Sequence, residues 1–251
     1  MGKLDGKVVI VTGGAQGIGA SYARAVVREG GKVAVCDILD TAAIVAELGA
    51  DVAMGGPCDV TDEASVVSFV DAVIDRFGRI DGLVNNAALF ASLGKNKPFD
   101  QIDSAEFDKV LQINVRGIFE VSKAVVPHMR SQGYGKIVNI SSGTAFKGTP
   151  GKAHYVASKG AVIALSRVMA RETGKDGIRV NTVAPGFTLS EGVMEWGDEV
   201  ARHSAPSVNS RCIPRDQRPE DLDGAIVFLL SPDSDFISGQ TLAVDGGSVM
   251  N

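Results

Sequence analysis

The sequence has few cysteines, no long hydrophobic run and no cluster of basic residues. Its 25 basic and 30 acidic residues leave a net charge of −5, so binding to nucleic acid or to an anionic membrane is not expected. No apolar stretch approaches the ~18 residues of a membrane span. In the first residues, charges interleave with a short apolar run, unlike the order of a secretory signal. We therefore expect a protein that works away from membranes and nucleic acids.

Cysteine occurs three times, at Cys36, Cys58 and Cys212, and no CxxC pair is present. The odd number and the spacing indicate free thiols and a reducing, cytoplasmic location. The three histidines show no metal-ligand spacing with one another or with cysteine, so no metal site is expected. Glycine is the one abundant residue, at 30 of 251 positions, which points to tight turns or to backbone that approaches a ligand closely.

Short β-branched runs alternate with longer amphipathic segments along the whole chain. Strands are predicted at 8–12, 32–36, 52–58, 82–85, 136–140, 178–183 and 241–244, and helices at 17–29, 41–48, 62–77, 104–130, 155–172 and 219–230. This order predicts an α/β protein with a doubly wound, seven-stranded parallel sheet and helices on both faces. The strands are almost continuously apolar, as expected when both faces are covered. No linker divides the pattern, so one domain is expected over 1–251.

One segment, 187–216, interrupts this alternation. It contains Trp196, His203 and two prolines, and only a weak helical pattern at 192–201. A long irregular segment in a compact α/β domain is usually a lid or a binding loop, although a tolerated surface insertion is the simpler alternative. We expect a substrate lid here.

A glycine-rich turn follows the first predicted strand and opens a helix. Gly13, Gly17 and Gly19 have the spacing G-x3-G-x-G, with Gln16 and Ile18 between them. Glycines let the backbone approach a pyrophosphate, and the helix N-terminus offers free N–H groups and a positive dipole end. An ordinary strand-to-helix turn would have similar glycines, but the position after the first strand favours a dinucleotide site.

The second predicted strand is followed by Asp37. An acid at this place can accept hydrogen bonds from the ribose diol of adenosine, and it would repel the 2′-phosphate of NADP. Ile38 and Leu39 supply no cation to offset that repulsion. Asp37 could alternatively cap the next helix. Together with the glycine turn, it favours NAD as the cofactor.

Tyr155 and Lys159 are four residues apart at the start of a predicted helix, so their side chains lie on one face. A lysine ammonium beside a phenol favours the phenolate and lowers the pKa of the tyrosine. Such a tyrosine can exchange a proton with an alcohol or carbonyl oxygen. Ser141 and Ser142 end the preceding strand, which places hydroxyls at the edge of the sheet where ligands bind.

At this point the sequence resembles the short-chain dehydrogenase/reductase family over essentially its whole length. The resemblance implies a Rossmann fold and hydride transfer between a secondary alcohol and NAD. One position departs from the family pattern, because Ala88 stands where a glycine usually follows Asn-Asn-Ala. The matching pieces are Thr12 to Gly19, Asp59-Val60, Asn85-Asn86-Ala87, Asn114, Ser142, the Tyr155/Lys159 pair and Pro185-Gly186.

The resemblance also implies a role for each matching residue. Tyr155 would be the general acid/base, and Lys159 would lower its pKa and bind the nicotinamide ribose. Ser142, thirteen residues before Tyr155, would bind the substrate oxygen, and Asn114 would hold a water in a proton relay. In addition to Tyr155 and Lys159, the residues implied to contact the cofactor are Gly13, Gln16, Gly17, Ile18, Gly19, Asp37, Asp59, Val60, Asn86, Ala87, Pro185, Gly186 and Thr188.

Apolar residues predominate among those expected near the substrate, which favours a hydrophobic, cyclic or aromatic alcohol or ketone. Apolar side chains on more than one face of the helices at 104–130 and 155–172 agree with the homotetramer usual in the family, although burial within one domain would also explain them. The expected substrate contacts are Ser142, Phe146, His154, Phe187, Met194 and Trp196.

Three other functions are considered. An NADPH-dependent 3-ketoacyl thioester reductase would need a cation near Asp37 and a basic docking patch, and neither is evident. A nicotinamide-sensing module without turnover would be expected to lose Ser142, Tyr155 or Lys159, and all three are present. A purely structural oligomeric protein would leave the same residues unexplained.

Overall fold

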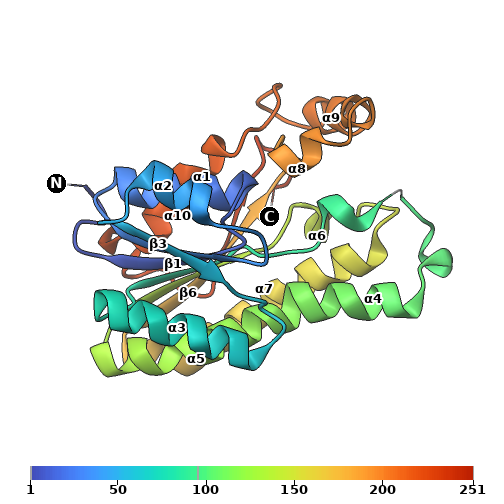
Figure 1. Cartoon of the computed structure of the whole chain (residues 1–251). Coiled ribbons are helices and arrows are strands. Elements are labelled where there is room, and N and C mark those ends of the chain that lie inside the picture. Colours follow the sequence, from blue (N-terminus) through green and yellow to red (C-terminus); the bar gives the residue numbers. More distant parts are fainter. Residues whose placement is uncertain (1, 95, 251) are drawn as a thin grey trace.

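The computed structural model describes residues 2–94 and 96–250, which form one α/β domain (Figure 1). Seven parallel strands are ordered β3-β2-β1-β4-β5-β6-β7, with each neighbouring pair hydrogen-bonded. Because the chain runs outward from β1 to β3 and then returns to place β4 on the other side of β1, a crevice forms at the carboxyl ends of these strands. The strands are β1 (Val8–Thr12), β2 (Lys32–Asp37), β3 (Ala53–Pro57), β4 (Gly82–Asn85), β5 (Gly135–Ile140), β6 (Ile178–Pro185) and β7 (Thr241–Val244).

Both faces of the sheet are covered, which explains why the strands are apolar at successive positions. In β1, Val9 and Val11 join one core cluster and Val8 and Ile10 join the other, because neighbouring strand residues point to opposite faces. The first face carries α1 (Gly17–Arg28), α2 (Ala42–Leu48) and α10 (Glu220–Leu230). The second carries α3 (Glu63–Phe77), α5 (Gly117–Gln132) and α7 (Ala153–Thr173). The predicted fold class is confirmed.

The element boundaries differ from the predictions in a few places. The long helix expected at 104–130 is α4 (Ser104–Leu111), a π-helical turn (Gln112–Arg116) and α5, which follow one another directly. The segment 187–216 is more helical than expected, because it contains α8 (Glu191–Met194) and α9 (Glu199–Asn209). These two helices, orange in Figure 1, lie apart from the helices that cover the sheet. A further four-residue helix, α6 (Thr144–Lys147), follows β5.

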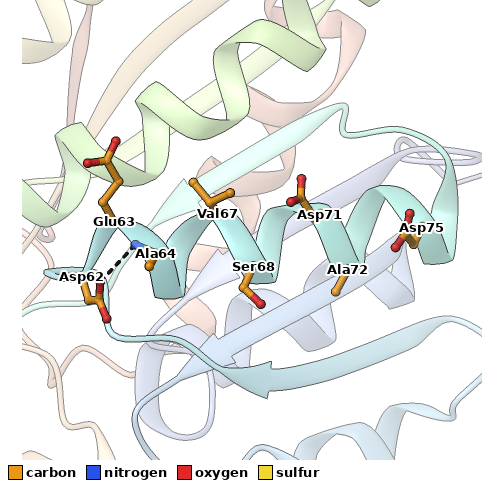
Figure 2. Close-up of a pocket in the computed structure, with 8 residues that line it drawn as sticks. All are labelled: Asp62, Glu63, Ala64, Val67, Ser68, Asp71, Ala72 and Asp75. Carbon is orange, nitrogen blue, oxygen red and sulfur yellow. Dashed lines mark hydrogen bonds between the residues drawn. The ribbon is translucent and has the colours of Figure 1, made fainter.

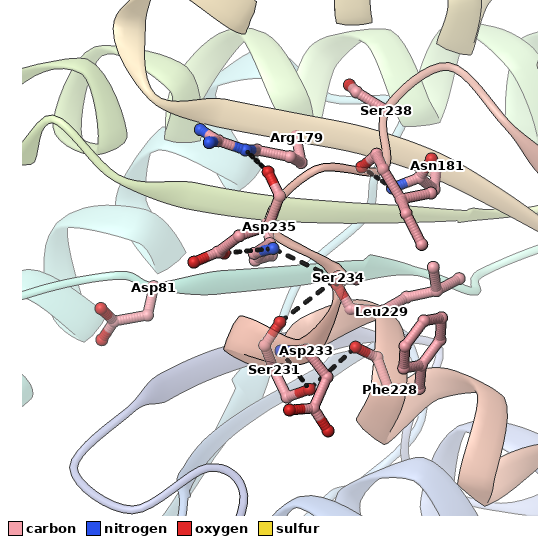
Figure 3. A network of polar contacts seen from close by, with 12 residues as sticks. Asp81, Arg179, Asn181, Phe228, Leu229, Ser231, Asp233, Ser234, Asp235 and Ser238 are labelled. Carbon is pink, nitrogen blue, oxygen red and sulfur yellow. Dashed lines mark hydrogen bonds and ion pairs between the residues drawn. The ribbon is translucent and has the colours of Figure 1, made fainter.

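An ion pair between a buried lysine and a half-exposed aspartate lies near the amino ends of the strands, away from the crevice. Lys136, at the start of β5, is 1% exposed, and its Nζ lies 2.7 Å from Oδ1 of Asp235 and 3.1 Å from Oγ of Ser234. Figure 3 shows Asp235 between Ser234 and Arg179, whose Nε donates to the Asp235 carbonyl. Burial lowers the pKa of Lys136, and the carboxylate of Asp235 opposes that change. This network fixes the segment after α10 against β5 and β6.

None of the helices in residues 2–94 and 96–250 combines the length and the apolar character that a membrane crossing needs.

Candidate active site

A cavity of about 1010 Å³ opens at the carboxyl ends of the strands. Its walls come from the turn after β1, the loops after β4 and β5, the start of α7 and the segment 187–216. One end is formed by the glycine turn and Asp37, and the other by aromatic side chains. The cavity therefore has the position expected of a ligand site in an open α/β sheet.

The glycine turn is tightly packed. Gly13 and Gly17 have φ values of 64° and 60°, which side chains with a Cβ rarely adopt. At Gly19 a Cβ would lie 2.1 Å from the carbonyl oxygen of Gly13. The Nδ2 of Asn86 donates to the carbonyls of Thr12 and Gly13, at 3.0 and 2.9 Å. The side-chain amide of Asn86 thus holds the turn in shape, a role that sequence reasoning did not include.

Asp37 lies beside this turn, at the end of β2. Its Oδ2 accepts a hydrogen bond from Ala15 N at 3.1 Å, and its Oδ1 accepts one from Leu39 N at 3.0 Å. The neighbouring Ile38 is 77% exposed, and it also lines the cavity. Asp59 and Val60, after β3, complete this end. The structure therefore brings together an acid, apolar side chains and the glycine turn, and no basic residue of the described chain pairs with Asp37.

Tyr155 and Lys159 line the middle of the cavity, and both are buried. The Nζ of Lys159 donates to the carbonyl of Ile140 at 2.8 Å and lies 5.6 Å from the centroid of the Tyr155 ring. Burial raises the pKa of Tyr155 to about 12, although polar contact with Ser142 lowers it. Burial lowers the pKa of Lys159 to about 7. Burial is therefore the largest influence on the pKa of this phenol in the cavity described here.

The two serines after β5 differ in their surroundings. The Oγ of Ser141 donates to the carbonyl of Lys159 at 2.8 Å, which occupies its hydroxyl. The Oγ of Ser142 accepts from the backbone N and the Oγ1 of Thr144, at 3.2 and 3.0 Å. Its own proton is therefore available, and Ser142 is the serine whose hydroxyl lowers the pKa of Tyr155.

Asn114 lies in the π-helical turn between α4 and α5 and is fully buried. Its Oδ1 accepts from Leu89 N at 2.7 Å, and its Nδ2 donates to Leu89 O and to Ser158 Oγ, at 3.3 and 3.1 Å. Its side chain does not line the cavity. The structure thus places Asn114 at a local irregularity of the helix, behind the loop after β4.

Among the expected substrate contacts, Ser142, Phe187 and Trp196 line the cavity, whereas Phe146, His154 and Met194 do not. His154 points away because its Nε2 lies 3.2 Å from Glu106 of α4 and its Nδ1 accepts from Tyr155 N. Met194 is 54% exposed, on the outer side of α8. These three side chains therefore lie outside the cavity where the sequence placed them at the substrate. Proximity in sequence to Tyr155 or to the lid did not determine which way each side chain points.

Aromatic rings form the far end of the cavity. The ring centroid of Phe90 lies 4.8 Å from that of Tyr155 and 5.6 Å from that of Trp196. Phe187 is 6.0 Å from Trp196, and His203 of α9 is 5.2 Å from Trp196. The indole Nε1 of Trp196 donates to Ala91 O at 3.0 Å, which ties the segment 187–216 to the loop after β4. His203 was not predicted, because the helix that positions it was not recognised beyond residue 201.

A second, shallow depression runs along the outer side of α3. Figure 2 shows the acidic side chains of this depression, Glu63, Asp71 and Asp75, projecting from α3. The side chain of Asp62 caps the start of the helix by accepting a hydrogen bond from Ala64 N. These carboxylates form a solvated helix face. Within the described ranges, no three His, Cys, Asp or Glu side chains gather closely enough to hold a metal ion.

Comparison with known proteins identifies the class that this fold and cavity define. A profile of the family described as enoyl-(acyl carrier protein) reductase matches residues 13–249. The chain belongs to the short-chain dehydrogenase/reductase family of oxidoreductases, which act on secondary alcohols and on ketones. Members of this family bind a nicotinamide cofactor.

Particular relatives have different named substrates. A sorbitol dehydrogenase from Cereibacter sphaeroides is 39% identical over 260 residues, which cover 99% of this chain and 100% of that protein. The crystal structure of a levodione reductase has a TM-score of 0.87 and 34% identity, with 97% of each chain covered. The crystal structure of a 3-ketoacyl-(acyl-carrier-protein) reductase from Brucella melitensis, complexed with NADH, has a TM-score of 0.89 and 30% identity, covering 98% of this chain and 99% of that one.

Proposed function

We propose that this protein is an NAD(H)-dependent oxidoreductase that interconverts a secondary alcohol and a ketone with a hydrophobic, cyclic or aromatic body. One observation carries the proposal. A single cavity runs from the glycine turn, past Tyr155, Lys159 and Ser142, to a cluster of aromatic rings. That order suits a cofactor at one end, a proton-transfer group in the middle and an apolar substrate at the other end.

The cavity fits a dinucleotide in two respects. At Gly13 and Gly19 the turn leaves no room for a side chain, and Gly17 has a positive φ, so bare backbone is present where a pyrophosphate would approach the start of α1. At the opposite side, Oδ2 of the buried Asp245 lines the cavity region beside Gly143 and has no hydrogen-bond partner within the described residues. A carboxamide NH₂ is a donor that such an acceptor requires. Asp37, without a neighbouring cation, favours NAD over NADP.

The bound nicotinamide supplies the hydride acceptor or donor at its C4. Tyr155 would take the hydroxyl proton of the alcohol and return it during ketone reduction. The hydroxyl of Ser142 would donate a hydrogen bond to the substrate oxygen. Lys159 in its ammonium form would favour the phenolate by charge and bind the nicotinamide ribose. Asn114, held by Leu89 and Ser158, would keep a water near Lys159 for proton exchange with solvent.

Further residue assignments belong to this proposal. Thr188 and the Pro185-Gly186 turn would contact the nicotinamide amide, and Phe187 with Trp196 would cover the substrate. The segment 187–216 would act as the lid. The remaining cofactor contacts proposed are Gln16, Ile18, Asp59, Val60, Asn86 and Ala87, all of which line the cavity.

A homotetramer in the cytoplasm is part of the same proposal. Phe119 of α5 and Val168 of α7 are 48% and 52% exposed on the outer helix layer, which favours a covering subunit. The three cysteines are free, as suits a reducing compartment. Light scattering after gel filtration would give the subunit number, and a monomer at micromolar concentration would overturn this part.

The experiment that tests the function follows NADH absorbance with NAD or NADP and a panel of secondary alcohols. The panel extends from cyclohexanol and 1-phenylethanol to hydroxysteroids and sugar alcohols. Turnover with NAD should fall by ~10²-fold or more in Tyr155→Phe, because the proton-transfer group is lost, while NADH binding is retained. A ketoacyl thioester reductase would instead prefer NADPH and a thioester. Turnover that survives in Tyr155→Phe would refute the proposed role of the phenol.

A further inference from the structure

Lys152 is a buried lysine at the aromatic end of the cavity. It directly precedes α7, is 9% exposed and lines the cavity. Its Nζ lies 5.9 Å from the ring centroids of both Phe90 and Trp196. Aromatic faces attract a cation at such distances. The ammonium is therefore held against the two rings that form the wall of the substrate end.

This ammonium has an incomplete set of partners. Its Nζ donates one hydrogen bond, to Gly94 O at 2.9 Å, although an ammonium has three donors. Within residues 2–94 and 96–250, no carboxylate forms an ion pair with Lys152. The acid with the largest charge effect on it, Glu106, is already paired with Lys97 and His154. Burial accordingly lowers the pKa of Lys152. A buried cation without a carboxylate is costly unless a ligand supplies the missing charge.

The charges of the cavity are divided between its two ends. Asp37 and Asp59 belong to the glycine-turn end, whereas Lys147, Lys152 and Arg202 lie toward the segment 187–216. Arg202 is paired with Glu199 on the surface of α9, and the Nζ of Lys147 is bonded to serine hydroxyls. Apart from Lys159, which belongs to the proposed proton-transfer group, Lys152 is the cavity-lining cation of the described chain that is both buried and without an anionic partner.

We propose, resting on the function proposed above, that Lys152 is the counter-ion for a carboxylate on the substrate. The substrate class is then a ketone or secondary alcohol that bears a carboxylate on a short apolar or aromatic spacer. The ring of Phe90 lies beside both groups, because its centroid is 4.8 Å from that of Tyr155 and 5.9 Å from Nζ of Lys152. A short spacer, such as one aromatic ring, is therefore the first to test.

A matched pair of substrates tests the assignment. The wild-type protein with NAD should oxidise 4-(1-hydroxyethyl)benzoate with a kcat/KM about tenfold or more above that of 1-phenylethanol, because a hydrogen-bonded charge is gained. Lys152→Met keeps the length of the side chain but removes the charge, and should lower kcat/KM for the carboxylate by about tenfold, mainly through KM. The neutral alcohol should change by less than about threefold. Lys175→Met, which removes an exposed lysine that does not line the cavity, is the matched control.

Binding provides a readout that does not need turnover. Calorimetry of 4-acetylbenzoate with the NADH-bound protein should show a Kd about tenfold higher in Lys152→Met than in wild type or Lys175→Met. An equal loss for both alcohols, or an unchanged preference in Lys152→Met, would overturn the assignment. If neither alcohol is oxidised but 4-acetylbenzoate binds through Lys152, the anion site stands and the proposed function fails. If 1-phenylethanol is oxidised and Lys152→Met does not change carboxylate binding, the function stands and the anion site fails.

Discussion

The side chain of Glu191 in α8 accepts a hydrogen bond from the backbone N–H of Gly17, the first residue of α1. This contact joins the segment 187–216 to the glycine turn across the mouth of the cavity. A carboxylate at a helix N-terminus is stabilised by the dipole and by the free N–H groups. The same N–H groups are those that a pyrophosphate would use. Glu191 and a pyrophosphate bound at this turn would therefore compete for one position.

Removing the charge of Glu191 should strengthen cofactor binding. In Glu191→Gln, the weaker acceptor competes less well with pyrophosphate, and like-charge repulsion disappears. We expect the Kd for NADH, measured by fluorescence titration, to fall by about three- to tenfold. Glu195→Gln, a change on the same segment without a contact to the turn, is the control. A higher Kd in Glu191→Gln would mean that the carboxylate supports the bound state instead.

The choice of cofactor should change with two residues at the end of β2. Asp37→Ser removes the repulsion toward a 2′-phosphate, and Ile38→Arg adds a cation at a side chain that is 77% exposed. Each effect of about 1.4 kcal/mol changes the affinity about tenfold, so the ratio of kcat/KM for NADP to that for NAD should rise by about 100-fold in the double variant. Asp40→Ser, which removes an acid outside the cavity, should leave the ratio unchanged. A wild-type protein that already prefers NADP would contradict the interpretation of Asp37.

Lys159 should lower the free energy of unfolding, and this effect should be larger at low pH than at high pH. Its pKa is about 7 when folded, below the ordinary value of 10.5, so between these values the unfolded chain binds more protons. Stability from this group therefore rises as pH increases from about 7 to about 10. Lys159→Met should raise the free energy of unfolding by ~1–3 kcal/mol at pH 6 and by less at pH 9.5, because the buried charge is gone.

Urea unfolding at the two pH values checks this prediction, and activity should be lost in the same variant. Lys175→Met, at an exposed residue, should change the free energy of unfolding by the same amount at pH 6 and at pH 9.5. Both values lie below pH 10, where the raised pKa of Tyr155 begins to act in the opposite direction. An equal change in stability at both pH values would show that packing, and not charge, is responsible.

The ion pair of Lys136 and Asp235 should affect stability without affecting catalysis. Asp235→Ala leaves a buried ammonium without its carboxylate and should cost ~1–3 kcal/mol. The double variant Lys136→Met/Asp235→Ala should recover most of that loss, because Met fills the space without a charge. Chemical denaturation measures both, and kcat should stay within about twofold of wild type because the pair lies at the other end of β5. A double variant as unstable as the single one would refute this account.

Much of the fold follows from residue periodicity, because buried parallel strands are apolar at every position and amphipathic helices repeat between them. The limits of this reasoning appear at α9, where Pro206 and a high content of polar residues hid a helix of 11 residues. The π-helical turn at Asn114 could not be predicted from the sequence either, because it adds one residue to a helical turn without changing the apolar pattern. Local sequence does not record either feature.

The candidate site was predictable where spacing along one element fixes geometry, as for Tyr155 and Lys159 on α7. It was not predictable where side-chain direction depends on distant partners. His154 turns toward Glu106, and Lys152 turns into the cavity toward Phe90 and Trp196. The pKa of Tyr155 depends on burial in the assembled site, which no four-residue spacing encodes.

The cavity is lined by residues that are far apart in the sequence, from Gly13 after β1 to Asp245 after β7. Since β7 pairs only with β6 at the edge of the sheet, the last wall is in place only after that edge strand has docked. In a partly folded chain in which β7 has not yet docked, the glycine turn and Tyr155 would be in place, but the cavity would lack one wall. Recovery of enzymatic activity during refolding should therefore lag behind the recovery of helical circular dichroism. The rate at which activity returns would then report the docking of β7.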